Sequence, residues 1–284
     1  MGLVDATVGR RPGGNVIPHV RTFAAIARSG FRRYSTYRQA TIAGAFTNIV
    51  FGFLRCYVLL AAASAAGGTV GGYDGRQLAT SDWVGQGMIA VVGLWGWTEL
   101  ADRIRTGEVA SDLLRPVHPV TSYLATDLGR ATYALLTRFV PPVLTGPLFF
   151  DLRLPGHWTT WPLVASSLLL AVLTSFGCRY LVNATAWWLH DARGPQMFWT
   201  LCSGVLGGLY FPLRFLPDWA YQTLLLATPF PGLMQTPLDL LLERDDGAER
   251  VGALAVQAGW AVLTLAACRL VQARAEHRLV VQGG

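Results

Sequence analysis

The chain has 284 residues, of which 52% are hydrophobic and only 14% charged. Charged residues make up about a quarter of a typical soluble protein, so this composition indicates a membrane protein. It excludes a disordered regulator, a disulfide-stapled scaffold and a small soluble enzyme with a charged surface. The formal net charge is +6, and every basic residue is Arg because the chain contains no Lys. The four Cys residues lie in apolar stretches, where Cys behaves as a small hydrophobic residue.

Six windows are long and apolar enough for helices that cross a bilayer, which takes about 20 residues each. They cover residues 41–64, 83–101, 123–150, 161–189, 195–212 and 251–270. Their apolar runs are continuous and do not alternate with a period of two, which argues against a membrane barrel. The sequence therefore predicts an all-α integral membrane protein with six transmembrane helices.

The distribution of Arg predicts the orientation of these spans. If both termini are cytoplasmic, the inner connections hold fourteen Arg and the outer connections hold five. Positive residues concentrate on the cytoplasmic side of membrane proteins, so we expect this orientation. Residues 1–40 then form a cytoplasmic tail with an amphipathic helix, and residues 41–284 form the transmembrane domain. Residues 1–40 lack the pattern of a secretory signal, so we expect them to remain in the mature protein.

Two segments outside the spans have their own patterns. Residues 19–38 place apolar residues such as Phe23 and Phe31 on one helical face and Arg residues such as Arg32 opposite or beside it. This predicts a helix along the inner membrane surface, either as a lipid anchor or as a docking element for a protein. Residues 213–239 are apolar but are broken by four Pro. They are expected to form short re-entrant helices at the outer face, between the fifth and sixth spans.

Sites for covalent chemistry do not emerge from the sequence. A phosphate-binding loop needs a Lys, the five His are scattered, and no G-x-S-x-G motif is present. We therefore expect no catalytic residue, no metal and no cofactor on this chain. Three ionisable residues within the spans are candidates for a polar pathway: Arg55, Glu99 and Arg138. If Arg55 and Arg138 both line a cavity, they would favour anionic groups of a substrate. Asp127 and Arg130 stand three apart, where a local ion pair can form.

The most informative segment lies between the second and third spans. Residues 106–115 are expected to form a short helix that carries Glu108 and Asp112 four residues apart and stops before Pro116. A helix this short is marginal in water, so we expect a partner to stabilise it. Leu113 and Leu114 would insert into a groove on that partner as apolar anchors, with Arg115 at the rim.

Residues 107–116 read G-E-V-A-S-D-L-L-R-P. This stretch resembles the L-L-R-P signature of one bacterial subfamily of ABC-2-type (type V) ABC transporter permeases, which is described as drug- or antibiotic-export-like. The expected topology of nearly the whole chain is similar to these permeases as well. The resemblance implies a coupling helix at about residues 105–117 that docks into a separate cytoplasmic ATPase. The helix that carries Phe23, Phe31 and Arg32 would pack beside it.

The resemblance also implies a function and a set of partners. The chain would be a non-catalytic, multi-pass permease of the bacterial cell membrane that exports an amphipathic, drug-like or lipid-like molecule. ATP and Mg²⁺ would bind to the partner ATPase dimer, and a second permease, a paralogue or a copy of this chain, would complete the pathway. Membrane lipids are expected partners, and nucleic acid is not. Two alternatives are an intramembrane lipid-modifying enzyme that uses Glu99, Asp102 or His118, and an ion-coupled secondary transporter.

Overall fold

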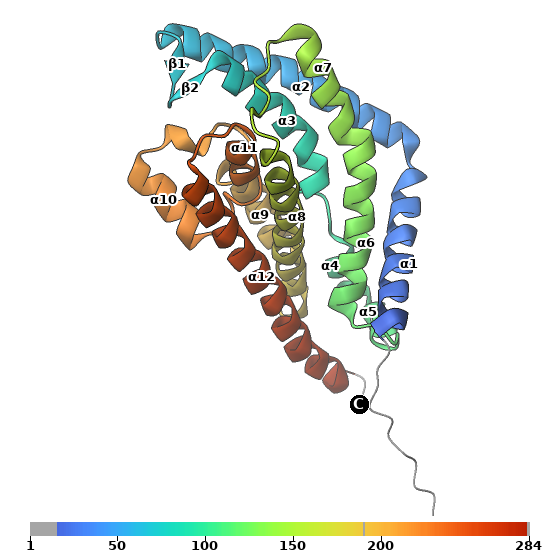
Figure 1. Ribbon diagram of the computed structural model, residues 1–284. Coiled ribbons are helices and arrows are strands. Elements are labelled where there is room, and N and C mark those ends of the chain that lie inside the picture. Colours follow the sequence, from blue (N-terminus) through green and yellow to red (C-terminus); the bar gives the residue numbers. More distant parts are fainter. Residues whose placement is uncertain (1–15, 190, 283–284) are drawn as a thin grey trace, which may run out of the picture.

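The computed structural model describes residues 16–189 and 191–282, which form a bundle of helices with one small hairpin (Figure 1). The predicted tail up to residue 15 therefore lies outside the described residues. In chain order the elements are α1 (Val16–Ser35), α2 (Arg38–Ala65), β1 (Thr69–Val70), β2 (Tyr73–Asp74), α3 (Gly75–Val92), α4 (Glu99–Thr106), α5 (Val109–Leu113), α6 (Pro119–Ala134), η1 (Leu135–Phe139), α7 (Val140–Phe149), α8 (Thr160–Ala184), η2 (Thr185–Trp187), α9 (Arg193–Val205), η3 (Leu213–Phe215), α10 (Asp218–Ala227), α11 (Gln235–Leu241) and α12 (Gly247–Gln282). The predicted all-α class is confirmed.

Three of the described helical segments are long and apolar enough to cross a membrane: Arg38–Ala65, Thr160–Trp187 and Gly247–His277. They coincide with the first, fourth and sixth predicted windows. The third window falls on α6, η1 and α7, which follow one another without a gap. The second window is divided between α3 and α4, and the fifth falls on α9, which has only 13 residues. The six-span count therefore stays a prediction.

Helix α3 ends where the second window was expected to continue. Asp74 and Gln77 form a reciprocal capping box at its start, and Gly93 ends it in the left-handed conformation with φ of 68°. A side chain at position 93 would be strained by this backbone, and a Cβ would lie 2.6 Å from the Arg130 guanidinium. Residues 94–98 then lead to α4, so the predicted span is not one continuous helix.

The helix formed by α6, η1 and α7 contains one irregular turn. The five residues of η1 are π-helical, and after Val140 they are followed by Pro141 and Pro142. Proline has no backbone N–H, so the carbonyls of the preceding turn lose their regular partners. A single π turn adjusts the helix locally, and such turns are frequent at functional sites.

Helix α1 lies lengthwise beside α6 (Figure 1). Two glycines allow this close approach: a Cβ on Gly129 would lie 2.0 Å from the Ala27 carbonyl oxygen, and one on Gly30 would lie 2.4 Å from the Thr126 carbonyl oxygen. Phe31 also meets Tyr133 edge to face, with ring centroids 5.4 Å apart. The sequence predicted the amphipathic helix but not that α6 would be its partner.

Helices α8 and α12 pack together along the other side of the bundle (Figure 1). The buried side chain of Gln257 on α12 donates hydrogen bonds to the Ser167 carbonyl (2.9 Å) and to the Gly232 carbonyl (2.7 Å). Further along the same contact, the Tyr180 hydroxyl donates to the Gln272 side chain over 2.6 Å. These buried polar contacts fix the two helices relative to each other, since each polar group needs its partner there.

Residues 213–239 form separate short helices, η3, α10 and the first part of α11, as the four Pro residues predicted. Asp239 on α11 is almost fully buried and fixes this segment to its neighbours. It accepts hydrogen bonds from the hydroxyl of Tyr73 (2.9 Å), the amide of Gln235 (2.8 Å) and the guanidinium of Arg214 (3.0 Å). The contact with Tyr73 joins the segment to the β hairpin.

Candidate functional site

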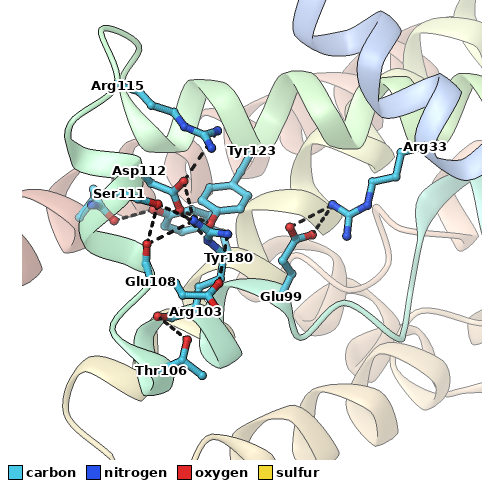
Figure 2. A network of polar contacts seen from close by, with 11 residues as sticks. Arg33, Glu99, Arg103, Thr106, Glu108, Ser111, Asp112, Arg115, Tyr123 and Tyr180 are labelled. Carbon is cyan, nitrogen blue, oxygen red and sulfur yellow. Dashed lines mark hydrogen bonds and ion pairs between the residues drawn. The ribbon is translucent and has the colours of Figure 1, made fainter.

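The segment between α3 and α6 forms two short helices rather than the single helix expected over residues 106–115. Helix α4 begins earlier, at Glu99, and ends at Thr106, while α5 covers only Val109–Leu113. The break lies at Gly107, whose φ of 78° is in the left-handed region that favours glycine. Because the chain reverses there, α4 and α5 lie against each other (Figure 2).

Arg103 on α4 holds this pair of helices together. Its guanidinium donates to both carboxylate oxygens of Asp112 on α5, over 2.9 and 3.0 Å. It also donates to the Ser111 hydroxyl (3.0 Å) and to the Glu108 carbonyl (3.2 Å) (Figure 2). Burial lowers the pKa of Arg103, but the hydrogen bonds to Asp112 together with the electrostatic effects of Tyr123, Asp112 and Glu108 raise the pKa above its usual value. A bidentate, charge-assisted pair of this kind fixes orientation as well as distance.

Asp112 points inward, although its place in the sequence predicted a helix that faces a partner. Its side chain is buried, with an exposed fraction of 7%. Besides Arg103 it accepts a 2.8 Å hydrogen bond from the Tyr123 hydroxyl at the start of α6, and it lies 3.8 Å from the Arg115 guanidinium. Asp112 therefore anchors α5 to the bundle and leaves little carboxylate surface for a partner.

The residues directly after α5 form the exposed part of the segment. The side chain of Leu114 is 87% exposed, the Arg115 side chain is 60% exposed, and Leu113 is partly buried. Leu114 is therefore a single exposed apolar side chain next to a rigid helix pair. Glu108 is also exposed, and Pro116 lines an adjacent cavity.

A second ion pair joins this segment to α1. The Arg33 guanidinium donates to both carboxylate oxygens of Glu99, over 3.0 and 2.9 Å (Figure 2). The hydrogen bond to Glu99 raises the pKa of Arg33 above its usual value. A cavity of about 460 Å³ lies between α1, α4 and the start of α6, and both residues line it. Glu99 thus belongs to this polar site, and its part in an intramembrane pathway stays a prediction.

The other predicted residues of α1 divide between the packing contact and the surface. Phe23 and Phe31 are partly buried, and Phe31 contacts Tyr133, as described above. Arg32 is exposed. Arg33, next to it, makes the contact with Glu99, and no helical pattern in the sequence distinguished the two arginines.

The arginines within the bundle have different surroundings. Arg55 on α2 lies 3.2 Å from a carboxylate oxygen of the buried Asp82 on α3. Arg138 on η1 lines a cavity of about 270 Å³ that Arg55 does not line. Arg55 is not among the residues that line this cavity, so a cavity shared by the two arginines stays a prediction. Arg130 forms the expected local pair with Asp127 (2.7 Å).

Several residues of the site were missed by the sequence analysis. Arg103 and Tyr123 hold Asp112, but they are nine and eleven residues away from it in the chain, and Ser111 accepts a hydrogen bond from Arg103. Neither Arg103 nor Tyr123 shares a helix with Asp112, so helical spacing could not predict these contacts. The one local signal is Gly107, which allows a reversal between two short helices. Among the described residues, no group of three or more His, Cys, Asp or Glu is arranged to hold a metal ion.

The long apolar helices, together with charged contacts gathered around α1, α4 and α5, define a helical membrane protein with a rigid polar site at one end of its bundle. Residues 46–283 match the model of the ABC-2 family transporter proteins. The match covers most of the chain, so the chain belongs to this family of ABC transporter membrane proteins. A search of curated proteins found no match. Members of the family are generally non-catalytic permeases and usually act with an ABC ATPase.

Proposed function

We propose that this chain is one half of an exporter's translocation pathway and that the segment from α4 to Pro116 is its contact with a separate ATPase. The observation that carries the proposal is the exposure of Leu114. This residue lies directly after α5, which the Arg103–Asp112 ion pair holds against α4. An exposed apolar anchor on a rigid support can enter a groove on a partner at a low entropic cost.

The ion pairs around this segment provide a route for coupling. A motor can shift a permease between two conformations only if it binds them with different affinities. A force on α5 would reach α4 through the Arg103–Asp112 pair and α6 through Tyr123. The Arg33–Glu99 pair would carry it to α1, which packs along α6. The segment would thus move as one body with α1 and α6.

The proposal also covers the nucleotide site, the second permease, the topology and the cargo. ATP and Mg²⁺ would bind to the ATPase dimer, because this chain has no Lys for a phosphate-binding loop. A second permease, a paralogue or a copy of this chain, would supply the other half of the pathway. We propose six spans with cytoplasmic termini in a bacterial cell membrane, re-entrant helices at α10 and α11, and an amphipathic cargo. The L-L-R-P subfamily also stays a prediction.

The alternative of an intramembrane enzyme gains no support from the contacts of two of its candidate residues, Glu99 and Asp102. Glu99 is engaged with Arg33, and the Asp102 carboxylate accepts from the Thr98 hydroxyl (2.9 Å) and from Arg105 (3.4 Å). A general acid or base must be free to reach a proton of the substrate, whereas these two carboxylates bind neighbouring side chains of the protein.

The test compares two exposed leucines. A tagged chain is purified in mild detergent from membranes that contain its natural partners, as the wild type, as Leu114→Asp and as Leu154→Asp. Leu154 is also exposed (69%), but it lies in the loop between α7 and α8. Loss of one apolar anchor typically weakens an interface by about 2 kcal/mol, which is roughly thirtyfold. We therefore expect Mg²⁺-dependent ATP hydrolysis to co-purify with the wild type and Leu154→Asp, and to be largely lost with Leu114→Asp.

Two results would contradict the proposal. One is equal ATP hydrolysis in the Leu114→Asp and Leu154→Asp preparations, together with unchanged transport. The other is transport by the purified chain alone, without a second polypeptide that hydrolyses nucleotide.

A further inference from the structure

A second cavity, of about 270 Å³, lies between α2, the end of α3, α6, η1 and α8. Its lining contains three arginines, Arg130, Arg138 and Arg179, and no acidic residue. Arginine side chains inside a membrane protein are costly, and they usually face a cavity or a partner that compensates their charge. The charge balance of this cavity therefore shows what could bind there.

Two of the three arginines share one carboxylate. Asp127 accepts from Arg130 over 2.7 Å and from Arg179 over 2.8 Å, and both partners are themselves largely buried. Arg130 also donates to the carbonyls of Ala90 and Val91. Two positive charges on one negative charge leave an excess of one positive charge beside the cavity.

Arg138 adds a second positive charge without any compensation. No described residue forms a hydrogen bond or an ion pair with its guanidinium, and its Nε atom is buried without a partner. The residue lies on the π-helical turn η1, and its guanidinium lies against Gly44 on α2, where a Cβ would be only 1.7 Å away. The chain thus makes room for an unpaired cation at this cavity.

The cavity lies near the start of α2, which is the end of that candidate span nearest to α1. Helix α2 has 28 residues and is about 42 Å long, whereas the hydrocarbon core is about 30 Å thick. The helix is therefore long enough for one of its ends to reach the lipid head groups. Neighbouring residues on the same elements are apolar and exposed, among them Ile42 (70%), Phe46 (66%) and Leu136 (59%).

We infer that this cavity binds the anionic head group of an amphiphile, a phosphate or a carboxylate, with Arg138 as its principal ligand. A guanidinium with free donors forms charge-assisted hydrogen bonds with such groups. The hydroxyls of Tyr34 and Tyr133, which also line the cavity, add polar groups around the anion. The apolar tail would lie along the exposed faces of α2 and η1. The identification of this amphiphile as a transported molecule rests on the proposed function, whereas its binding does not.

The experiment measures binding to the purified chain in dodecyl maltoside by isothermal titration calorimetry. Dodecyl phosphate is the probe, phosphatidylglycerol represents a resident lipid, inorganic phosphate represents a free anion, and phosphatidylcholine is the zwitterionic control. The variants are Arg138→Gln, which removes the charge, and Gly44→Ala, which keeps it but displaces the guanidinium. Arg153→Gln, at an exposed residue of the loop between α7 and α8, is the matched control.

We expect Arg138→Gln and Gly44→Ala each to weaken dodecyl phosphate binding about tenfold, and Arg153→Gln to leave it unchanged. Inorganic phosphate and phosphatidylcholine should bind much more weakly. Comparable Arg138-dependent binding of phosphatidylglycerol would support the site with a lipid as its natural occupant. Equal binding in the wild type and Arg138→Gln would overturn the inference, as would inorganic phosphate binding as tightly as dodecyl phosphate. If ATP hydrolysis still co-purifies with Arg138→Gln, a failure of the binding inference would leave the proposed contact with an ATPase intact.

Discussion

The carboxylate of Asp127 on α6 lies 2.8 Å from the guanidinium of Arg179 on α8, although 52 residues separate them in the chain. Arg130 shares the same carboxylate. Removal of one partner from a buried ion pair leaves uncompensated charge and costs about 3–5 kcal/mol. We expect Asp127→Asn to destabilise the protein by about this amount, because both guanidinium groups lose their counter-ion. Thermal unfolding in detergent measures the effect.

Asp151 provides the matched control for this substitution. It pairs with Arg76 over 3.0 Å, but its side chain is 74% exposed. An exposed pair contributes about 0–1 kcal/mol, so Asp151→Asn should unfold close to the wild-type temperature. If Asp127→Asn and Asp151→Asn unfolded at the same temperature, the buried cluster would not hold α6 to α8.

Glu243, between α11 and α12, should make stability depend on pH. Its carboxylate accepts hydrogen bonds from the Gly156 and His157 amides (both 3.1 Å) and from the Thr160 hydroxyl. Burial alone would raise the pKa of Glu243, but these hydrogen bonds outweigh it and lower the pKa to about 2. Since the folded pKa lies below the unfolded value of about 4.3, the stabilisation is complete above that value. It is lost as the pH falls toward 2.

The test is a series of unfolding measurements between pH 7 and pH 3. Glu243→Gln should lower the free energy of unfolding at pH 7 by about 1–3 kcal/mol, and its difference from the wild type should shrink as the pH falls below about 4.3. Glu249→Gln, at an exposed residue in the first turn of α12, is the control and should follow the wild type. A difference that stays constant from pH 7 to pH 3 would argue against this role of Glu243.

The contact between α1 and α6 should not tolerate a methyl group. A Cβ at position 129 would lie 2.0 Å from the Ala27 carbonyl oxygen, and the backbone of α1 can yield only by moving away. Gly129→Ala should therefore cost about 1–3 kcal/mol and expose α1 to trypsin, which cleaves after exposed arginines such as Arg28. Gly259→Ala on α12, where nothing lies within 4 Å of the added atom, should retain wild-type resistance. Equal digestion of both variants would show that this close approach does not hold α1.

The proposed orientation can be tested with two leucines of similar exposure. Leu114 is 87% exposed at the end of α5, and Leu154 is 69% exposed in the loop between α7 and α8. In a background in which the four cysteines are replaced by Ala, Leu154→Cys should react with a membrane-impermeant maleimide in intact cells. Leu114→Cys should react only after the membrane is opened. The reverse pattern would invert the orientation, and labelling of both in sealed cells would contradict the topology.

The sequence was sufficient for the properties that depend on neighbouring residues. Hydropathy windows identified the helical regions, because the cost of placing a segment in lipid depends on its own side chains. The Pro residues predicted the short helices of residues 213–239, and the spacing of Asp127 and Arg130 predicted their local pair. The limits of α3 and of α4 were missed, because Gly93 and Gly107 adopt a left-handed backbone that their surroundings select.

Contacts across helices were decided only by the tertiary structure. In the sequence, Arg55 and Arg138 look alike, since each is a single charge in an apolar stretch. The packing of α2 on α3 places Asp82 beside Arg55, whereas no described acid lies beside Arg138. Which side chain faces which depends on the rotation and axial position of each helix, and these are fixed by close packing of the whole bundle. Local sequence patterns do not determine that packing, so the excess positive charge at the cavity could be identified only from the tertiary structure.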